Sequence, residues 1–413
     1  MEHSDQPPSG SMDSGVATLI VAGTGPAGLI AAAGLADAGF AVELVGPPVR
    51  ADDRRTTALM LPALAYLDRL GLSAPLQAAG APLSIMRIVD ATNRLVRSPT
   101  ATFRAAEIGE SAFGLNLPNA ELFRILADAG AARPAIRWTQ ATVERWDLGD
   151  DHATATLSDG TALTGRLAVA ADGRLSPARE AAGISTRSRA WDQSALVVNF
   201  SHTRPHEHTS TEFHTPTGPF TQVPLPGDRS SLVWVVRPPM AEELLALPDA
   251  ELSRRIEEGM QSMLGRVTVE PGRQVYPLAA TLALSHAANR VALVGEAAHV
   301  FPPIGAQGLN LGIRDVADLV DVVQQHRGDP GSRAALDAYG AKRRPDIFAR
   351  TGAVNLLNMS LLTDFLPAQI ARSVGLTLLG SVTPLRAFFM REGLRPGSGF
   401  AVFGSTAREK VRR

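Results

Sequence analysis

Three glycine-rich turns are the places in this sequence where residue types and spacing could do chemistry. The first is Gly23–Gly28, the second is Asp172-Gly173, and the third is Gly295-Glu296. The third turn continues through Pro302-Pro303 into a helix that we expect to begin near Gly305. A glycine-rich loop that leads into a helix directs backbone N–H groups and the positive end of the helix dipole at one spot. We therefore expect these turns to hold an electron-rich group such as a phosphate.

The first turn lies inside a strand–helix–strand unit. Residues 16–22 are apolar and β-branched, residues 29–39 are rich in Ala and Leu, and residues 40–45 return as a second strand. The turn reads G-x-G-x-x-G, in which the first glycine permits the turn and the second lets backbone approach a pyrophosphate. The third lets helix and strand pack closely. This setting predicts a dinucleotide-binding unit, and a purely structural turn is the alternative.

One residue that such units usually carry is missing. An Asp or Glu commonly ends the second strand and binds the adenosine ribose. Here the strand ends at Val45-Gly46-Pro47, and Glu43 lies three residues before Gly46. Strand alternation turns Glu43 to the opposite face. We therefore expect backbone groups or water to replace the carboxylate.

Two further groups of polar residues stand near the predicted turns. Arg54 and Arg55 lie near the start of an amphipathic segment, residues 52–70, that we interpret as a helix; they could reach a diphosphate or a flavin, and a solvated basic pair is the alternative. Asp172 follows the predicted strand 163–170, where a carboxylate can accept hydrogen bonds from sugar hydroxyls. An ordinary turn aspartate is the alternative for Asp172.

Composition excludes several classes of function. The hydrophobic fraction is 45% and the net charge is −1, so nothing electrostatic favours nucleic acid as a partner. The chain has no cysteine, which excludes disulfides and thiolate metal sites and fits a cytosolic protein. No apolar run approaches the roughly 20 residues of a membrane span. His202, His206 and His208 could suggest a metal, but their polar loop favours solvated histidines, so we predict no metal site.

The order of these elements predicts an α/β protein. Residues 1–15 are expected to be a disordered tail, and residues 16–185 the first part of a Rossmann-like domain, with residues 83–104 contributing to the substrate side. Residues 186–286 read as an inserted antiparallel sheet with a helix over 241–264, and residues 287–327 return to the first domain. Residues 332–413 are expected to be helical, and their apolar stretches favour core packing or dimerisation, with a membrane-facing surface as the alternative.

Taken together, these motifs resemble those of the single-component (group A) flavin aromatic hydroxylases, which have the p-hydroxybenzoate hydroxylase fold. The chain is most similar to the ubiquinone-biosynthesis branch, from about Val16 to about Pro396. The segment from Asp53 to Leu59 resembles that branch's D-x-R-x-x-A-L. Two departures are Glu296 in place of the usual Asp, and Gly46 in place of the ribose-binding acid. The resemblance implies that FAD is bound by Gly23, Gly25, Pro26, Ala27, Gly28, Arg54, Arg55, Asn119, Val143, Asp172, Gly295, Glu296, Gly308, Leu309 and Asn310.

The resemblance also implies the chemistry. In this family NADPH or NADH reduces the flavin, dioxygen forms a flavin 4a-hydroperoxide, and one oxygen atom passes to an aromatic ring. The cofactor carries this reaction, so no nucleophile–base constellation is needed. The expected catalytic positions are Pro302, Gly305 and His299: the Pro302-Pro303 loop would wall the reaction pocket, and His299 would orient the turn or relay a proton. The residues expected on the substrate side are Phe213, His214, Gln222 and Tyr276.

We expect the substrate to be a phenolic, polyprenylated ubiquinone precursor. The same chemistry on a soluble aromatic or polyketide is one alternative, and a non-catalytic FAD-fold scaffold is another. A halogenase would need a dedicated lysine near the flavin. It is disfavoured because the first lysine of the chain is Lys342. The expected location is the cytoplasm, with contact to the inner face of the membrane or to a biosynthetic complex left open, as is a homodimer.

Overall fold

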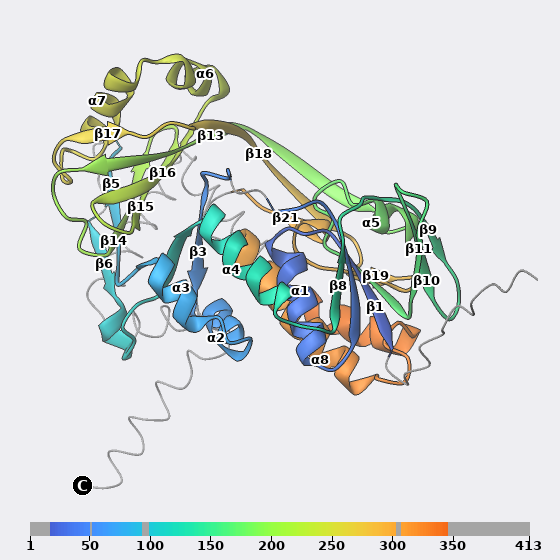
Figure 1. The fold of residues 1–413 in the computed structure, drawn as a ribbon. Coiled ribbons are helices and arrows are strands. Elements are labelled where there is room, and N and C mark those ends of the chain that lie inside the picture. The colour runs from blue at the N-terminus through green and yellow to red at the C-terminus, as the bar shows by residue number, and fades with distance from the viewer. Residues whose placement is uncertain (1–16, 50–51, 93–98, 303–306, 346–413) are drawn as a thin grey trace, which may run out of the picture.

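A computed structural model describes residues 17–49, 52–92, 99–302 and 307–345. The expected N-terminal tail and most of the expected C-terminal helical region lie outside the described residues. Within them, the first domain is built on a six-stranded sheet, of which β1, β8 and β19 are labelled in Figure 1. The strand order is β19-β20-β12-β1-β2-β8, and all neighbours are parallel except β19 and β20. Its strands are β1 (Thr18–Ala22), β2 (Ala41–Val45), β8 (Ile136–Thr139), β12 (Leu167–Ala170), β19 (Ala287–Ala288) and β20 (Val291–Leu293).

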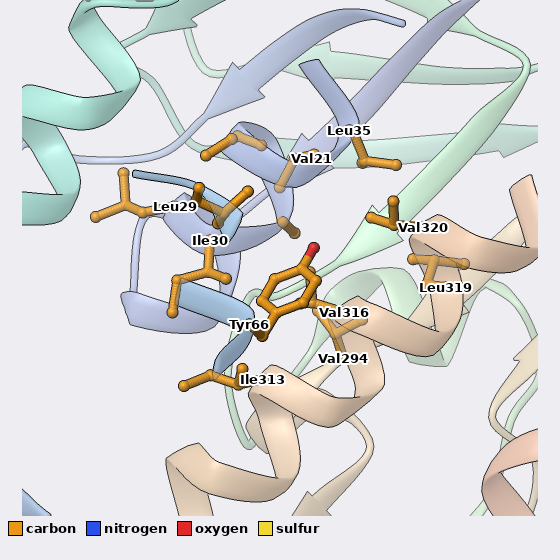
Figure 2. Packing of buried hydrophobic residues seen from close by; sticks show 14 of the residues in the cluster. Val21, Leu29, Ile30, Leu35, Tyr66, Val294, Ile313, Val316, Leu319 and Val320 are labelled. Carbon is orange, nitrogen blue, oxygen red and sulfur yellow. The ribbon is translucent and has the colours of Figure 1, made fainter. Parts of the chain in front are cut away.

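Both faces of this sheet are covered, which explains why β1 is apolar at consecutive positions. Leu19 and Val21 pack against α1 (Pro26–Asp37) and α8 (Gln307–Gln325), whereas Ile20 packs against a small antiparallel sheet on the other face. That small sheet contains β9 (Val143–Leu148), β10 (Ala153–Leu157) and β11 (Ala162–Gly165). Figure 2 shows the helix side of this core, with Val21, Leu29, Ile30, Leu35, Tyr66, Val294, Ile313, Val316, Leu319 and Val320.

The strand predicted over 163–170 is wrong as a single element. Its first half belongs to β11, which pairs with β10, and its second half is β12, which pairs with β1 in the six-stranded sheet. The chain changes sheets at Arg166, whose backbone N–H donates to the Thr18 carbonyl. The two halves differ in burial, because β11 alternates between exposed and buried positions whereas every residue of β12 is buried.

The second large unit is a nine-stranded sheet in the described chain, ordered β21-β18-β13-β16-β15-β14-β5-β6, with β17 paired to β13. Strands β5 and β6 come from the segment before the insertion, and β5 runs parallel to β14. The bounds are β5 Ile85–Asp90, β6 Ala101–Arg104, β13 Thr186–His202, β14 Thr209–Thr215, β15 Gly218–Leu225, β16 Arg229–Val236, β17 Val267–Val269, β18 Gln274–Ala283 and β21 His299–Val300.

Two helices cover one face of the large sheet. They are α6 (Pro238–Ala246) and α7 (Asp249–Gly259), and they lie on the side away from α1 and α8 (Figure 1). The single helix predicted over 241–264 is wrong. Pro248 separates the two helices, because proline has no N–H to donate and disfavours helical backbone at the residue before it.

The remaining elements are a three-stranded sheet of β3, β7 and β4 and several helices. The helix predicted over 52–70 is wrong in its first half, because residues 56–60 form a strand. This strand is β3 (Thr56–Met60), which pairs with β7 (Gly114–Pro118); β4 (Ala81–Pro82) pairs with the other side of β7. The helices are α2 (Leu61–Arg69), α3 (Ser73–Ala79), α4 (Asn119–Ala131), α5 (Pro177–Ala181), the 3₁₀ turns η1 (Ala105–Ile108) and η2 (Gly295–Ala297), and a helix at residues 333–345.

Candidate active site

The three glycine-rich turns meet at one edge of the six-stranded sheet. They follow β1, β12 and β20, which are neighbours with parallel strand directions, so their carboxyl ends lie side by side. In open α/β sheets, ligands bind at this edge. These loops are more than a hundred residues apart in the sequence, and the order of the strands brings them together.

The first turn and the second are in direct contact. Gly23 has φ +108°, and a Cβ there would lie 2.2 Å from the Ala171 carbonyl oxygen. A Cβ on Gly28 would lie 1.9 Å from the Gly23 oxygen, whereas a Cβ on Gly25 would meet nothing within 4 Å. Gly23 and Gly28 are thus required by packing, and Gly25 faces open space. Pro26 is the first residue of α1, and Ala27 packs against the helix-side core.

The third turn packs on the first. A Cβ built on Gly295 would lie 2.9 Å from the Ala27 Cβ, and one on Gly312 of α8 would lie 3.1 Å from the Gly295 Cα. Gly308 and Leu309 lie in the first turn of α8 as described, where N–H groups point along the axis. Glu296 is exposed beside them. Gly305 lies outside the described residues, and Pro302, just before that gap, is buried.

Asp172 has a buried oxygen that no described residue satisfies. Its Oδ2 accepts a hydrogen bond from the Ala178 N–H at 3.1 Å, but its Oδ1 has no partner among the described residues. Burial raises the pKa of this carboxyl, against the opposing effect of Ser176. A buried, unsatisfied acceptor beside an open glycine turn is the arrangement a hydroxyl-rich ligand would complete. These residues fit the expected FAD.

Arg55 connects the turns to the large sheet. Its guanidinium forms a two-pronged pair with Asp53, with a shortest N–O distance of 2.6 Å. The Arg55 pKa is raised by the Asp53 hydrogen bond, and smaller contributions come from Tyr276 on β18 and Glu296 in the third turn. Arg55 therefore lies within electrostatic reach of both the turn and the sheet. Burial would raise the pKa of Asp53, but hydrogen bonds from Arg55 and Asn119 lower it.

The side chain of Asn119 is fully engaged with this segment. Its Nδ2 donates to Asp53 at 3.1 Å, and its Oδ1 accepts from the Thr57 hydroxyl at 2.7 Å. Asn310 has a similar role, since its side chain bonds the backbone of Met60 and Ala58 and so ties β3 to α8. Direct contacts from Asn119 and Asn310 side chains to FAD remain predictions.

Arg54 is directed at the large sheet. It donates to the Pro271 carbonyl at 2.8 Å, and its own carbonyl accepts from Asn199 of β13 at 2.8 Å. The neighbouring Thr56 hydroxyl bonds Ser231 of β16 at 3.0 Å. Asn199 and Ser231 mark the face of the sheet that is turned toward the glycine turns, and we call it the site face.

The four expected substrate residues do not lie on one face. The Phe213 ring contacts Phe220 at 5.8 Å and belongs to the cluster under α6 and α7. Gln222 shares that face by strand alternation and donates to Ser230 at 2.8 Å. Tyr276 and His214 lie on the site face, where the Tyr276 hydroxyl bonds Gln274. Alternation along β14 and β15 therefore separates Phe213 and Gln222 from the side that a substrate beside the turns would meet.

Sequence reasoning missed Glu212. It lies two residues before His214 on the same face of β14 and accepts from His214 Nε2 at 2.9 Å. The Glu212 side chain is 22% exposed and that of His214 is 7% exposed. A Glu-x-His sequence inside a strand was the available signal, because residues i and i+2 of a strand share a face.

Sequence reasoning also missed Asp315, a buried carboxylate on α8. It accepts from His299 Nε2 at 2.6 Å, so His299 is fixed in orientation and lies on β21. The helical period placed Asp315 among the apolar positions 311, 312, 316 and 319, which was the signal that it is buried.

The interpretation of three solvated loop histidines needs correction for His202. It is buried at the end of β13, with Nδ1 against the Arg204 carbonyl and Nε2 against Ser230, and burial lowers its pKa. His206 Nε2 contacts the Leu225 carbonyl at 2.9 Å. Among the described residues, no group of three or more His, Asp or Glu side chains is arranged to hold a metal ion.

The ribose end of the site departs from the usual pattern for a physical reason. A Cβ on Gly46 would lie 2.8 Å from the Thr24 side chain, whose hydroxyl donates to the Pro47 carbonyl at 2.6 Å. Thr24 thus occupies the space an acidic residue at position 46 would need. Glu43 points elsewhere and pairs with Arg137 at 2.7 Å. Val143 starts β9 and packs in the cluster that contains Val45 at the end of β2.

The comparisons with known proteins decide the family. A family model described as an FAD binding domain matches residues 16–351. The chain belongs to this FAD-binding family. It is 35% identical to the ubiquinone hydroxylase UbiL of Rhodospirillum rubrum over 94% of this chain and 91% of that protein. It is 29% identical to the 3-demethoxyubiquinol 3-hydroxylase of Escherichia coli over 87% and 93% of the two chains.

Solved structures support the same fold. The p-nitrophenol 4-monooxygenase PnpA of Pseudomonas putida has a TM-score of 0.74 at 23% identity, covering 93% of this chain and 98% of that one. HpxO of Klebsiella pneumoniae, solved with FAD and uric acid, has a TM-score of 0.69 at 20% identity, covering 92% and 97%. The predicted hydroxylase family, α/β FAD-binding fold and FAD cofactor are confirmed. No described helix is both long and apolar enough to cross a bilayer.

Proposed function

We propose that this protein is an FAD-dependent monooxygenase that hydroxylates the aromatic ring of a phenolic, polyprenylated ubiquinone precursor with NAD(P)H and O₂. The observation that carries the proposal is the 35% identity to a ubiquinone hydroxylase over nearly the full length of both chains. The meeting of the three turns opposite the site face of the large sheet is consistent with it. Bound FAD would supply the oxygen activation.

The residues of the chain would hold and shield the reactants. The turn at Gly23–Gly28 and Asp172 would bind the dinucleotide, and the first turn of α8 would stabilise negative charge on the cofactor. Arg55, within electrostatic reach of Tyr276 and Glu296, would stand between cofactor and substrate. Pro302 would help to exclude water, and His299 would orient the turn.

On the substrate side, the Glu212–His214 pair would take the phenol proton. A phenol reacts faster as phenolate, so an acceptor is needed near its hydroxyl. The 2.9 Å hydrogen bond to Glu212 orients the His214 ring, and both residues lie on the site face with Tyr276. Phe213 and Gln222 would act indirectly by packing under that face.

The experiment is a two-part assay on the purified protein and on a deletion strain. The protein should be yellow and should oxidise NADPH faster when a phenolic ubiquinone precursor is added. The deletion strain should accumulate a precursor that lacks one ring hydroxyl, detected by mass spectrometry. Stimulation by soluble phenols only, with a normal quinone profile, would instead favour a soluble aromatic substrate.

A polyprenylated substrate would place the enzyme at the inner face of the cytoplasmic membrane, because burying each CH₂ of the prenyl chain in lipid is favourable by about 0.8 kcal/mol. Contact with a biosynthetic complex and homodimer formation are the accompanying proposals. Flotation of the purified protein with and without anionic vesicles tests the membrane contact, and light scattering tests the homodimer. A monomer that never floats would contradict these two proposals.

A further inference from the structure

A buried charged network lies behind the third glycine-rich turn. Asp315 of α8 is at its centre: its Oδ2 accepts from the Gly295 backbone N–H at 3.0 Å and from His299 Nε2 at 2.6 Å. Its Oδ1 accepts from Arg343 Nε at 2.7 Å. The Asp315 and His299 side chains are 0% exposed, and that of Arg343 is 1% exposed.

The network joins the turn to a helix that lies outside the three glycine motifs. Arg343 belongs to the helix at residues 333–345, and its second prong bonds Asp318 of α8 at 2.7 Å. Tyr339 of the same helix donates to the Leu293 carbonyl at 2.7 Å. The helix thus fixes the chain at Leu293 directly and at Gly295 through Asp315. It holds the turn on both sides of Val294.

The buried charges explain how this network fixes the position of the turn at Gly295. Desolvation would raise the pKa of Asp315, but His299, Arg343 and the Gly295 N–H lower it, so the carboxylate is ionised. Loss of Arg343 would leave the Asp315 carboxylate buried without a compensating charge, which is strongly unfavourable. The donors around Asp315 are therefore held in one tightly constrained geometry. The Gly295 amide is one of those donors, which sets the turn that packs on Ala27.

We propose that Asp315 and Arg343 are positioning residues for FAD, which set the turn at Gly295–His299 and thereby complete the cofactor site from the helix at residues 333–345. They act through the turn and need not touch the cofactor. The proposal depends on FAD binding and not on the aromatic substrate. If the substrate assignment fails, the positioning role is unaffected. If the positioning role fails, the substrate assignment is unaffected.

The decisive variant replaces the charged pair by an apolar pair, Asp315→Leu with Arg343→Met. Replacing a buried ion pair by apolar residues of similar volume is often neutral or stabilising, but here two buried donors lose their acceptor, so we expect this variant to fold with a lowered urea midpoint. It removes the acceptor of the Gly295 N–H and the partner of His299. We expect its dissociation constant for FAD, measured by flavin fluorescence on the apoprotein, to rise at least about tenfold, which is about 1.4 kcal/mol.

The matched control is Lys342→Met on the same helix. Lys342 is 40% exposed and pairs with Asp318 and Asp321, so it carries charge next to the network without reaching the turn. Its FAD affinity should equal that of the wild type. Urea midpoints of all apoproteins are measured in parallel. A double variant that binds FAD as tightly as the wild type shows a role in stability alone and overturns the proposal, whatever its midpoint.

A third variant covers failure of the double variant to fold. Arg343→Lys keeps the compensating positive charge, but its ammonium group cannot bond Asp315 and Asp318 together as the planar guanidinium of arginine does. Its FAD release rate, followed by the recovery of flavin fluorescence, should be at least about tenfold faster than that of the wild type. A release rate equal to that of the wild type would reject the positioning role.

Discussion

Protonation of His286 should make the protein lose stability in mild acid. This histidine lies between β18 and β19, its carbonyl accepts from the Leu293 N–H at 2.8 Å, and its Nε2 has no partner in the described part of the chain. Burial lowers its pKa from 6.5 to about 4. The folded protein therefore keeps the ring neutral at a pH where the unfolded chain would protonate it.

The sign and size of the effect follow from linkage. Between pH 6.5 and about pH 4 the unfolded state binds the extra proton, so the free energy of unfolding falls as the pH falls. The full difference between the two pKa values corresponds to roughly 3 kcal/mol, of which about 2 kcal/mol is lost between about pH 7 and pH 5.

The assay is urea denaturation of the apoprotein at a series of pH values. His286→Phe keeps an aromatic ring but cannot titrate, so its stability should fall less than that of the wild type by roughly 2 kcal/mol between about pH 7 and pH 5. His152→Gln, at an exposed histidine, is the control and should follow the wild type. If His286→Phe and the wild type show parallel pH dependences, the argument from burial is refuted.

Two substitutions test the site itself. Gly28→Ala should destabilise the apoprotein by roughly 1–3 kcal/mol and weaken FAD binding, because its Cβ would lie 1.9 Å from the Gly23 oxygen. Gly130→Ala in α4, where a Cβ meets nothing within 4 Å, should instead stabilise by about 0.5–1 kcal/mol; equal effects would contradict the packing argument. His214→Gln should lower the turnover of a phenolic substrate by about 10²–10⁴-fold while leaving FAD affinity unchanged. Full turnover in that variant would remove the Glu212–His214 pair from the proposed function.

Local signals in the sequence were sufficient for the cofactor loops. The turn at Gly23–Gly28 was predictable because the spacing of its glycines, between a buried strand and a helix, has a direct steric meaning. The first strand–helix–strand unit was predicted within two or three residues at each boundary. The helix at 307–325 was predictable from its apolar stripe in the same way.

Other features depended on contacts that are distant in sequence. The predicted strand 163–170 divides between two sheets, and Pro248 divides a predicted helix. Alternation could place Phe213 and His214 on opposite faces of a strand, but it could not say which face α6 and α7 would cover. That choice was made by packing between separate units.

The sequence by itself determined the family, the cofactor and the strand–turn–helix geometry of the first loop, because these depend on residues close together in the chain. Only the tertiary structure decided that Asp315 meets Arg343 and the Gly295 amide, and that Arg55 comes within electrostatic reach of Tyr276 and Glu296. Such interactions join elements hundreds of residues apart or on different helices. They are set by the order of strands in the sheet and by the requirement that buried charges find partners.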